Sequence, residues 1–270
     1  MKNPVSIFIM DVSNSTSNSN WNNISSYLDQ VEDWIKEWVS PVGKSIVKHR
    51  RGDEIIFVSE HYFTAYIVAC TLTHLWKYPE HKPYFGMSFG IIDKEIDAIN
   101  IETWNHPLVK LARDANEIIK QSNNRIPILF HLQRDYLIDN NSDFSGNNKC
   151  FMEMENSLNL LLELQHNLMN NQTDNQRLIR SLYFIYGQQK LVASLVNKSP
   201  ATISSHYKKG NTGLIFKTQT QIEQNLNSFQ ESYWENDVSR LSNKLNEVIK
   251  DIISKNVKEF ILLHDQGGDN

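Results

Sequence analysis

The sequence predicts an α+β fold, with a mixed N-terminal part and an all-helical C-terminal part. Through about residue 135, short apolar runs typical of strands alternate with segments whose apolar residues recur every three or four positions. Residues 139–149 are then almost entirely Asn, Ser, Asp and Gly, a composition typical of a linker. Every later segment has helical periodicity, so we place the boundary between the two parts in this linker.

The N-terminal elements follow from local patterns. A continuous apolar run that ends near Asp11 indicates a buried strand, and a one-sided apolar face followed by Pro41 indicates a helix. A glycine turn at Gly52 between two β-rich segments indicates a hairpin. The predicted order is strand Val5–Val12, helix Trp21–Val39, strands Ser45–Arg50 and Glu54–Ser59, helix His61–Trp76, strand Tyr84–Ile92, helix His106–Ser122 and strand Ile126–His131.

After the linker we expect a helix over Leu158–Met169, short helices between Gln176 and Lys209, and one long amphipathic helix from about Gln219 to Leu263. The predicted division is residues 1–138, a linker at 139–150, a second region at 151–215 and a tail at 216–270. The tail has a wide apolar stripe, which must be buried either on its own chain or in a homodimer.

Charge and composition limit the function. The 270 residues carry 27 Lys and Arg against 31 Asp and Glu, a net charge of −4, which argues against a uniformly basic nucleic-acid binder. Residues 173–217, however, hold seven basic residues and one acid, so a local basic surface is expected there. The chain has two cysteines and no apolar run long enough to span a membrane. We therefore expect a cytoplasmic protein without a membrane partner.

The basic segment contains the spacing of a helix-turn-helix. Ala193 provides a small residue in the first helix, Asn197 tolerates a left-handed turn, and Ile203 is the β-branched residue that anchors the second helix. Ser199 is placed as an N-cap, and Pro200 is the first helical residue. This pattern predicts a DNA-binding motif over 188–210.

DNA contacts are expected from polar side chains on and beside the second helix. The alternative is an ordinary helical hairpin with solvated lysines, and Lys198 departs from the motif because an apolar residue usually follows the turn. A homodimer would suit this motif, because two recognition helices can reach half-sites one DNA turn apart. The predicted DNA-binding residues are Lys190, Thr202, Ser204, Ser205, His206, Lys208 and Lys209.

Three acids in the N-terminal part form a second candidate site. Asp11 ends the first strand, and Asp53 with Glu54 lies at the hairpin turn, so the acids can meet across adjacent strands. Paired carboxylates bind Mg²⁺ together with nucleotide phosphates. The alternative is a solvated acid at a strand end and an ordinary turn. The residues predicted to contact the nucleotide are Ser13, Ser15, Arg51 and Arg113.

This order of elements resembles the palm-type core of class III nucleotide cyclases, GGDEF-type cyclases and polymerases, which implies a ferredoxin-like N-terminal domain. Through about residue 210 the chain also resembles the SatD family of bacterial proteins, which implies a palm-like domain followed by a helix-turn-helix. Val109 stands where class III cyclases carry an Asn, which favours nucleotide binding over turnover. The matching positions are Asp11 with Ser15, Gly52-Asp53-Glu54, Phe85-Gly86 and Ala112-Arg113.

Three functions are compatible with these features. The first is a DNA-binding transcriptional regulator whose N-terminal domain senses a nucleotide. The second is a Mg²⁺-dependent nucleotidyl cyclase or nucleotidyltransferase, in which the three acids hold the metal. The third is a protein-interaction module with a vestigial palm site.

Overall fold

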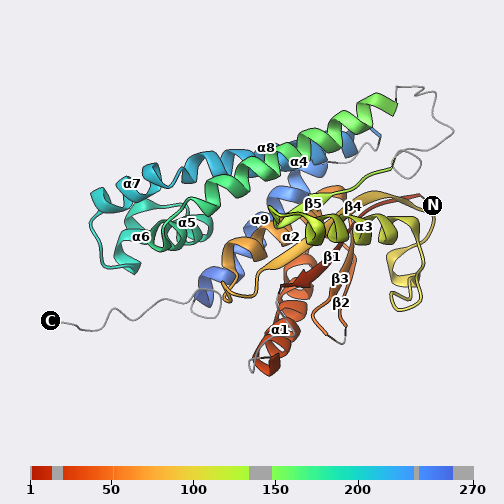
Figure 1. Cartoon of the computed structure of the whole chain (residues 1–270), viewed down its shortest axis with the longest axis horizontal. Helices are drawn as coiled ribbons and strands as arrows, with labels where there is room; N and C mark the ends of the chain where they lie inside the picture. The colour runs from red at the N-terminus through yellow and green to blue at the C-terminus, as the bar shows by residue number, and fades with distance from the viewer. Residues whose placement is uncertain (1, 14–20, 51, 134–147, 234–236, 258–270) are drawn as a thin grey trace.

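A computed structural model describes residues 2–13, 21–50, 52–133, 148–233 and 237–257. It contains a five-stranded mixed sheet with interleaved helices, followed by an all-helical region (Figure 1). The predicted α+β class is confirmed. Residues 139–147 of the predicted linker lie outside the described residues, and the next helix begins at Asn148, before the predicted end of the linker.

The sheet has the strand order β2-β3-β1-β4-β5. The central strand β1 pairs antiparallel with both β3 and β4, whereas β5 runs parallel to β4. Each predicted strand is present, with bounds within two residues of the prediction. The strands are β1 (Asn3–Val12), β2 (Ser45–His49), β3 (Ile55–Glu60), β4 (Pro83–Ile92) and β5 (Ile128–Phe130).

Helices cover both faces of this sheet. Because side chains alternate along a strand, Phe8 and Met10 of β1 pack toward α1 and α2, while Ile7 and Ile9 pack toward α3. The predicted helices of this part are confirmed: α1 (Trp21–Val39), α2 (Tyr62–Leu75) and α3 (Pro107–Gln121), with a short 3₁₀ helix, η1 (Ile96–Ala98), before α3.

Six helices are described after residue 147: α4 (Asn148–Asn170), α5 (Asp174–Tyr186), α6 (Gln189–Leu195), α7 (Pro200–Lys209), α8 (Thr212–Glu231) and α9 (Val238–Lys255). The prediction of one long helix from about Gln219 is wrong. The chain forms α8 and then α9, and the Asp237 side chain starts α9 by accepting a hydrogen bond from the Arg240 backbone N–H at 3.1 Å. The predicted boundary at 215/216 falls inside α8.

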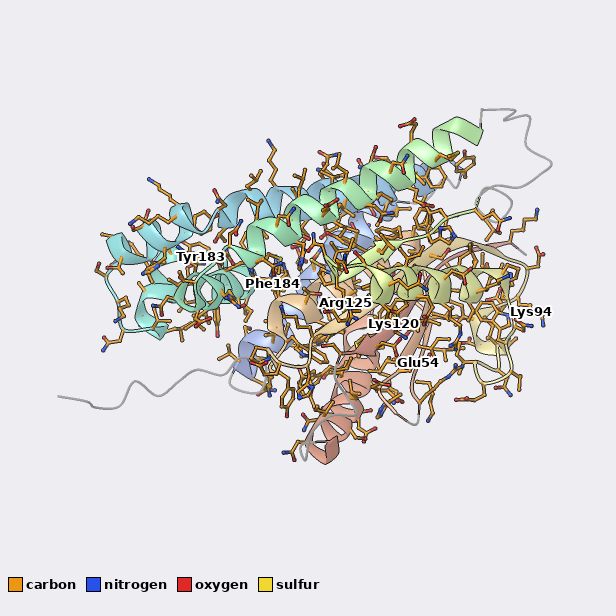
Figure 2. The ribbon with its side chains drawn as sticks, viewed as in Figure 1. Glu54, Lys94, Lys120, Arg125, Tyr183 and Phe184 are labelled. Atoms are coloured by element: carbon orange, nitrogen blue, oxygen red, sulfur yellow. The ribbon has the colours of Figure 1, made fainter. Side chains whose placement is uncertain are left out.

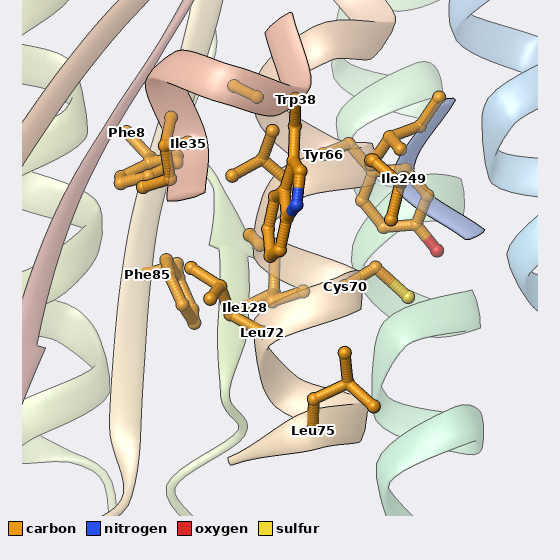
Figure 3. Packing of buried hydrophobic residues seen from close by; sticks show 14 of the residues in the cluster. Phe8, Ile35, Trp38, Tyr66, Cys70, Leu72, Leu75, Phe85, Ile128 and Ile249 are labelled. Carbon is orange, nitrogen blue, oxygen red and sulfur yellow. The ribbon is translucent and has the colours of Figure 1, made fainter. Parts of the chain in front are cut away.

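Helix α2 joins the two parts of the molecule. Its sequence is apolar all round, and every residue except Thr73 is buried. One side packs on the sheet, and the other packs on α5, α8 and α9. Figure 3 shows Trp38 of α1, Tyr66 of α2 and Ile249 of α9 within this core. The helical region therefore shares a continuous hydrophobic core with the N-terminal part.

The apolar face of α9 is buried on its own chain. Leu245, Ile249 and Ile253 belong to the same core, and α9 contacts α1, α2, α5 and α8. Over residues 238–257 this packing covers the stripe without a second copy, so a homodimer through this helix remains a prediction. None of the helices described here is long and apolar enough to cross a bilayer.

Candidate functional site

Helices α5, α6 and α7 pack on one another as a three-helix unit that contains the predicted helix-turn-helix. Asn197 lies between α6 and α7 with a φ of 50°, the left-handed conformation that the sequence predicted. The Ser199 hydroxyl accepts a hydrogen bond from the Thr202 backbone N–H at 3.2 Å, and Pro200 begins α7. Ile203 is fully buried, so α7 is fixed on the other two helices by its predicted anchor.

The predicted DNA-contacting residues divide into two groups. Lys190, Ser205, Lys208 and Lys209 are exposed, and Ser204 is half-buried. Thr202 and His206 are also half-buried, because they lie one helical turn apart on the side of α7 that lines a cleft toward the N-terminal part. Whether these two side chains contact DNA stays a prediction, and in this structure they face the cleft.

Arg180 adds nothing to the basic surface that the sequence predicted. It is only 4% exposed, and its Nη1 donates a hydrogen bond to the Gln172 Oε1 at 2.6 Å. The exposed positive charge of the three-helix unit comes from lysines together with Arg177, whose side chain is 50% exposed. The count of seven basic residues over 173–217 therefore overstates the exposed positive charge by one residue.

The three acids lie near one another at one end of β1 and β3. Since Met10 pairs with Ile55, the next residues along the two strands are Asp11 and Glu54. Burial raises the pKa of the Asp11 carboxyl, the Lys120 ammonium opposes this shift, and the charges of Asp53 and Glu54 raise the pKa further. Asp53 and Glu54 are therefore close enough to Asp11 for their charges to affect its carboxyl.

Helix α3 supplies positive and polar partners to these acids. The Asn116 Nδ2 donates a hydrogen bond to the Asp11 Oδ2 at 2.7 Å, and the Lys120 Nζ lies 2.8 Å from the same oxygen. Arg113 pairs with both oxygens of Glu54, at 3.0 and 3.3 Å. Figure 2 shows Lys120 and Glu54 in this region of the molecule.

Arg50 and Ser13 make two further contacts in this region. Arg50 lies 3.0 Å from Glu54, next to the Arg113 contact. The Ser13 hydroxyl accepts a hydrogen bond from the Lys82 backbone N–H at 2.9 Å, which links the residue after β1 to the segment before β4. The other two predicted nucleotide ligands, Ser15 and Arg51, lie outside the described residues.

Asn116 and Lys120 were not among the site residues predicted from the sequence. Together with Arg113 they are spaced by three and four residues, which places all three on one face of the predicted helix. That spacing was a usable signal. The close approach also depends on Gly86 in β4, where a Cβ would collide with the backbone of Ala112 and Asn116.

The arrangement does not fit a resident Mg²⁺. Such a cation needs carboxylate oxygens that are open to it, whereas Asp11 and Glu54 are paired with Lys120, Arg113 and Arg50. Among the residues that the structure describes, no group of three or more His, Cys, Asp or Glu side chains is arranged to hold a metal ion. The cluster as it stands joins α3 to the sheet.

Comparison with known proteins gives no independent assignment of this site. The chain matches no protein-family model, and no curated protein matches it significantly.

Proposed function

We propose that this protein is a DNA-binding regulator that reads DNA with α7. The observation that supports this most strongly is the turn at Asn197, which joins α6 to an α7 anchored by Ile203. The turn, the N-cap and the buried anchor together are the local geometry of a helix-turn-helix.

The chemistry of the exposed face agrees with this proposal. Lys208 and Lys209 at the end of α7, with Lys190 at the start of α6, provide positive charge for backbone phosphates. Ser205 lies exposed on α7 and can donate to or accept from a base edge. An acidic protein with an exposed basic face at these positions would bind DNA locally and with strong salt dependence.

For the N-terminal part we propose a palm-like domain that senses rather than catalyses. The strand order β2-β3-β1-β4, with α1 and α2 as crossovers, is that of the split βαβ ferredoxin-like arrangement, and this supports the likeness to palm domains and to the SatD family. The ion pairs at Asp11 and Glu54 support a role other than metal-dependent nucleotide cyclisation.

The direct test is fluorescence anisotropy with a labelled DNA duplex, titrated at several salt concentrations. We compare the wild type with a double variant, Lys208→Ala and Lys209→Ala. Each lost phosphate contact should lower the slope of log affinity against log salt by about 0.9, so the double variant should bind at least about tenfold more weakly, with a slope smaller by about 2.

The matched control is Lys94→Ala with Lys110→Ala, which removes the same charge from exposed positions outside the helix-turn-helix. Figure 2 places Lys94 at the opposite end of the molecule from Tyr183 of α5. The control should keep the wild-type slope. Equal weakening in both double variants, or no DNA binding by the wild type at low salt, would contradict the proposal.

A further inference from the structure

A cleft of about 1370 Å³ lies between the helix-turn-helix and the N-terminal part. Its walls come from the end of α2, the start of β4, the segment before β5, and from α4, α5 and the α6–α7 turn. None of the predicted site residues of the N-terminal part that the structure describes lines it. Thr202 and His206 of α7 do.

The cleft is strongly basic. Among the described residues that line it, Asp174 is the one acid, and its side chain is 99% exposed. The Lys and Arg residues that line the cleft come from both parts of the molecule and from distant positions in the sequence. The Lys and Arg residues of the lining are Lys77, Lys82, Arg125, Arg177, Arg180 and Lys198.

Arg180 gives the strongest indication of a ligand. Its guanidinium is buried, and its Nε has no hydrogen-bond partner among the described residues. Burial lowers its pKa to about 10; Cys70 opposes this shift, and the charge of Arg177 adds to it. Gln172, whose Oε1 accepts a hydrogen bond from the Arg180 Nη1, is neutral. A buried positive charge without a carboxylate partner is costly, and a bound anion would compensate it.

Lys82 adds positive charge to the same cleft. Burial lowers the pKa of His166 to about 4, and the charge of Lys82 contributes to this shift. His166 is therefore neutral at physiological pH, and its Nε2 lies 2.7 Å from the Asn170 Nδ2. A negative ligand in the cleft would therefore be attracted by Lys82 as well as by Arg177 and Arg180.

We propose that this cleft binds a phosphorylated small molecule of nucleotide size, with its phosphates at Arg177, Arg180 and Lys198. The volume exceeds the roughly 300–1,000 Å³ typical of small-molecule pockets, so a nucleotide with several phosphates fits. The half-buried rings of Trp76 and Tyr84 supply apolar surface for a base. A DNA duplex is a poorer occupant, because its backbone cannot reach a guanidinium that is 4% exposed.

The site also explains how a ligand would affect DNA binding. A molecule in the cleft covers Thr202 and His206, two of the residues expected to contact DNA, and neutralises Lys198. Ligand and DNA would then oppose each other's binding by the same factor. This coupling rests on the proposed function, whereas ligand binding in the cleft does not.

The test is isothermal titration calorimetry of the full chain with ATP in the absence of divalent metal, and with inorganic tripolyphosphate in a second arm. The variant is Arg177→Gln with Lys198→Gln, both at accessible positions. Arg180 is left intact, since its loss would also break the buried bond to Gln172. We expect saturable ATP binding by the wild type and at least about tenfold weaker binding by the double variant.

The control is Lys94→Gln with Lys110→Gln, which should bind ATP as the wild type does. The tripolyphosphate arm should compete with ATP, because the phosphates provide most of the recognition. The proposal is overturned if ATP does not saturate the wild type below about 1 mM. It is also overturned if the control loses as much affinity as the cleft variant, or if Asp11→Asn abolishes ATP binding while the cleft variant retains it.

A last arm measures DNA affinity with and without saturating ATP. Weaker DNA binding in the presence of ATP supports the coupling, and unchanged DNA binding overturns it. If the protein binds no DNA at all, the calorimetric arms still decide whether the cleft is a phosphate site. Failure of the proposed function and failure of this inference are therefore distinguishable.

Discussion

Arg113 and Glu54 are 59 positions apart in the chain, yet two guanidinium nitrogens of Arg113 lie 3.0 and 3.3 Å from the two carboxylate oxygens of Glu54. The pair joins α3 to the start of β3. Further along α3, Asn116 and Lys120 both contact the carboxylate of Asp11 and so join the helix to the end of β1. Two of the three acids that the sequence suggested as metal ligands, Asp11 and Glu54, thus hold a helix against the sheet.

This pairing predicts a weak response to magnesium. Adding Mg²⁺ should shift the melting temperature of the wild type no more than NaCl of equal ionic strength does, because the cation would have to displace Lys120 and Arg113. Differential scanning fluorimetry of the wild type and of Asp11→Ala measures this. A stabilisation by Mg²⁺ that occurs only in the wild type would show that the carboxylates form a metal site.

Gly86 should not tolerate a side chain. In Gly86→Ala the new Cβ meets the backbone of Ala112, so α3 must move away from β4, and we expect a loss of about 2 to 4 kcal/mol in the free energy of unfolding. Gly187→Ala is the comparison, since Gly187 has a φ of 64° but nothing near its Cβ position, and it should cost about 1 kcal/mol. Urea denaturation gives both values, and equal losses would contradict the steric explanation.

The turn residue Asn197 should matter through its backbone conformation. Asn197→Val places a β-branched residue at a φ of 50° and should cost about 1 to 2 kcal/mol in stability. Asn197→Gly should be neutral within about 0.5 kcal/mol, because glycine adopts this conformation readily. Urea denaturation and anisotropy with DNA follow the two variants. If valine were tolerated as well as glycine, the turn would not be the constraint on α7.

Acidification should destabilise the protein. The pKa of His166 is about 4 in the folded chain because of burial and the charge of Lys82, against 6.5 for an ordinary histidine. The unfolded chain therefore binds more protons between these values, so the free energy of unfolding falls as the pH is lowered from about 6.5 toward 4. Burial lowers the pKa of His74 in the same direction.

The variant His166→Gln separates the His166 contribution. It cannot take up this proton, so its free energy of unfolding should fall by about 1 to 2 kcal/mol less than that of the wild type over the same range. Urea titrations at a series of pH values measure the difference. Parallel pH profiles for the two proteins would show that His166 does not carry the effect.

Much of the fold could be predicted because its signals are local. The helix over Trp21–Val39 has the bounds that its apolar spacing indicates, and the left-handed Asn197 follows from residue type and position alone. Asp237 is a local N-cap signal for the start of α9, but the apolar stripe on which the prediction of one long helix was based gives no sign of this break.

The sequence by itself determined the strands, most helices, the turn between α6 and α7, and the presence of acids at two strand ends. Only the tertiary structure decided what those acids contact, since Asp11 and Lys120 meet through the path of the chain and through the close packing that Gly86 permits. It also brought Arg180 and Lys198 to one cleft with Lys82 and Arg125. Periodicity reports which face of an element is buried, but it carries no information about which distant element covers that face.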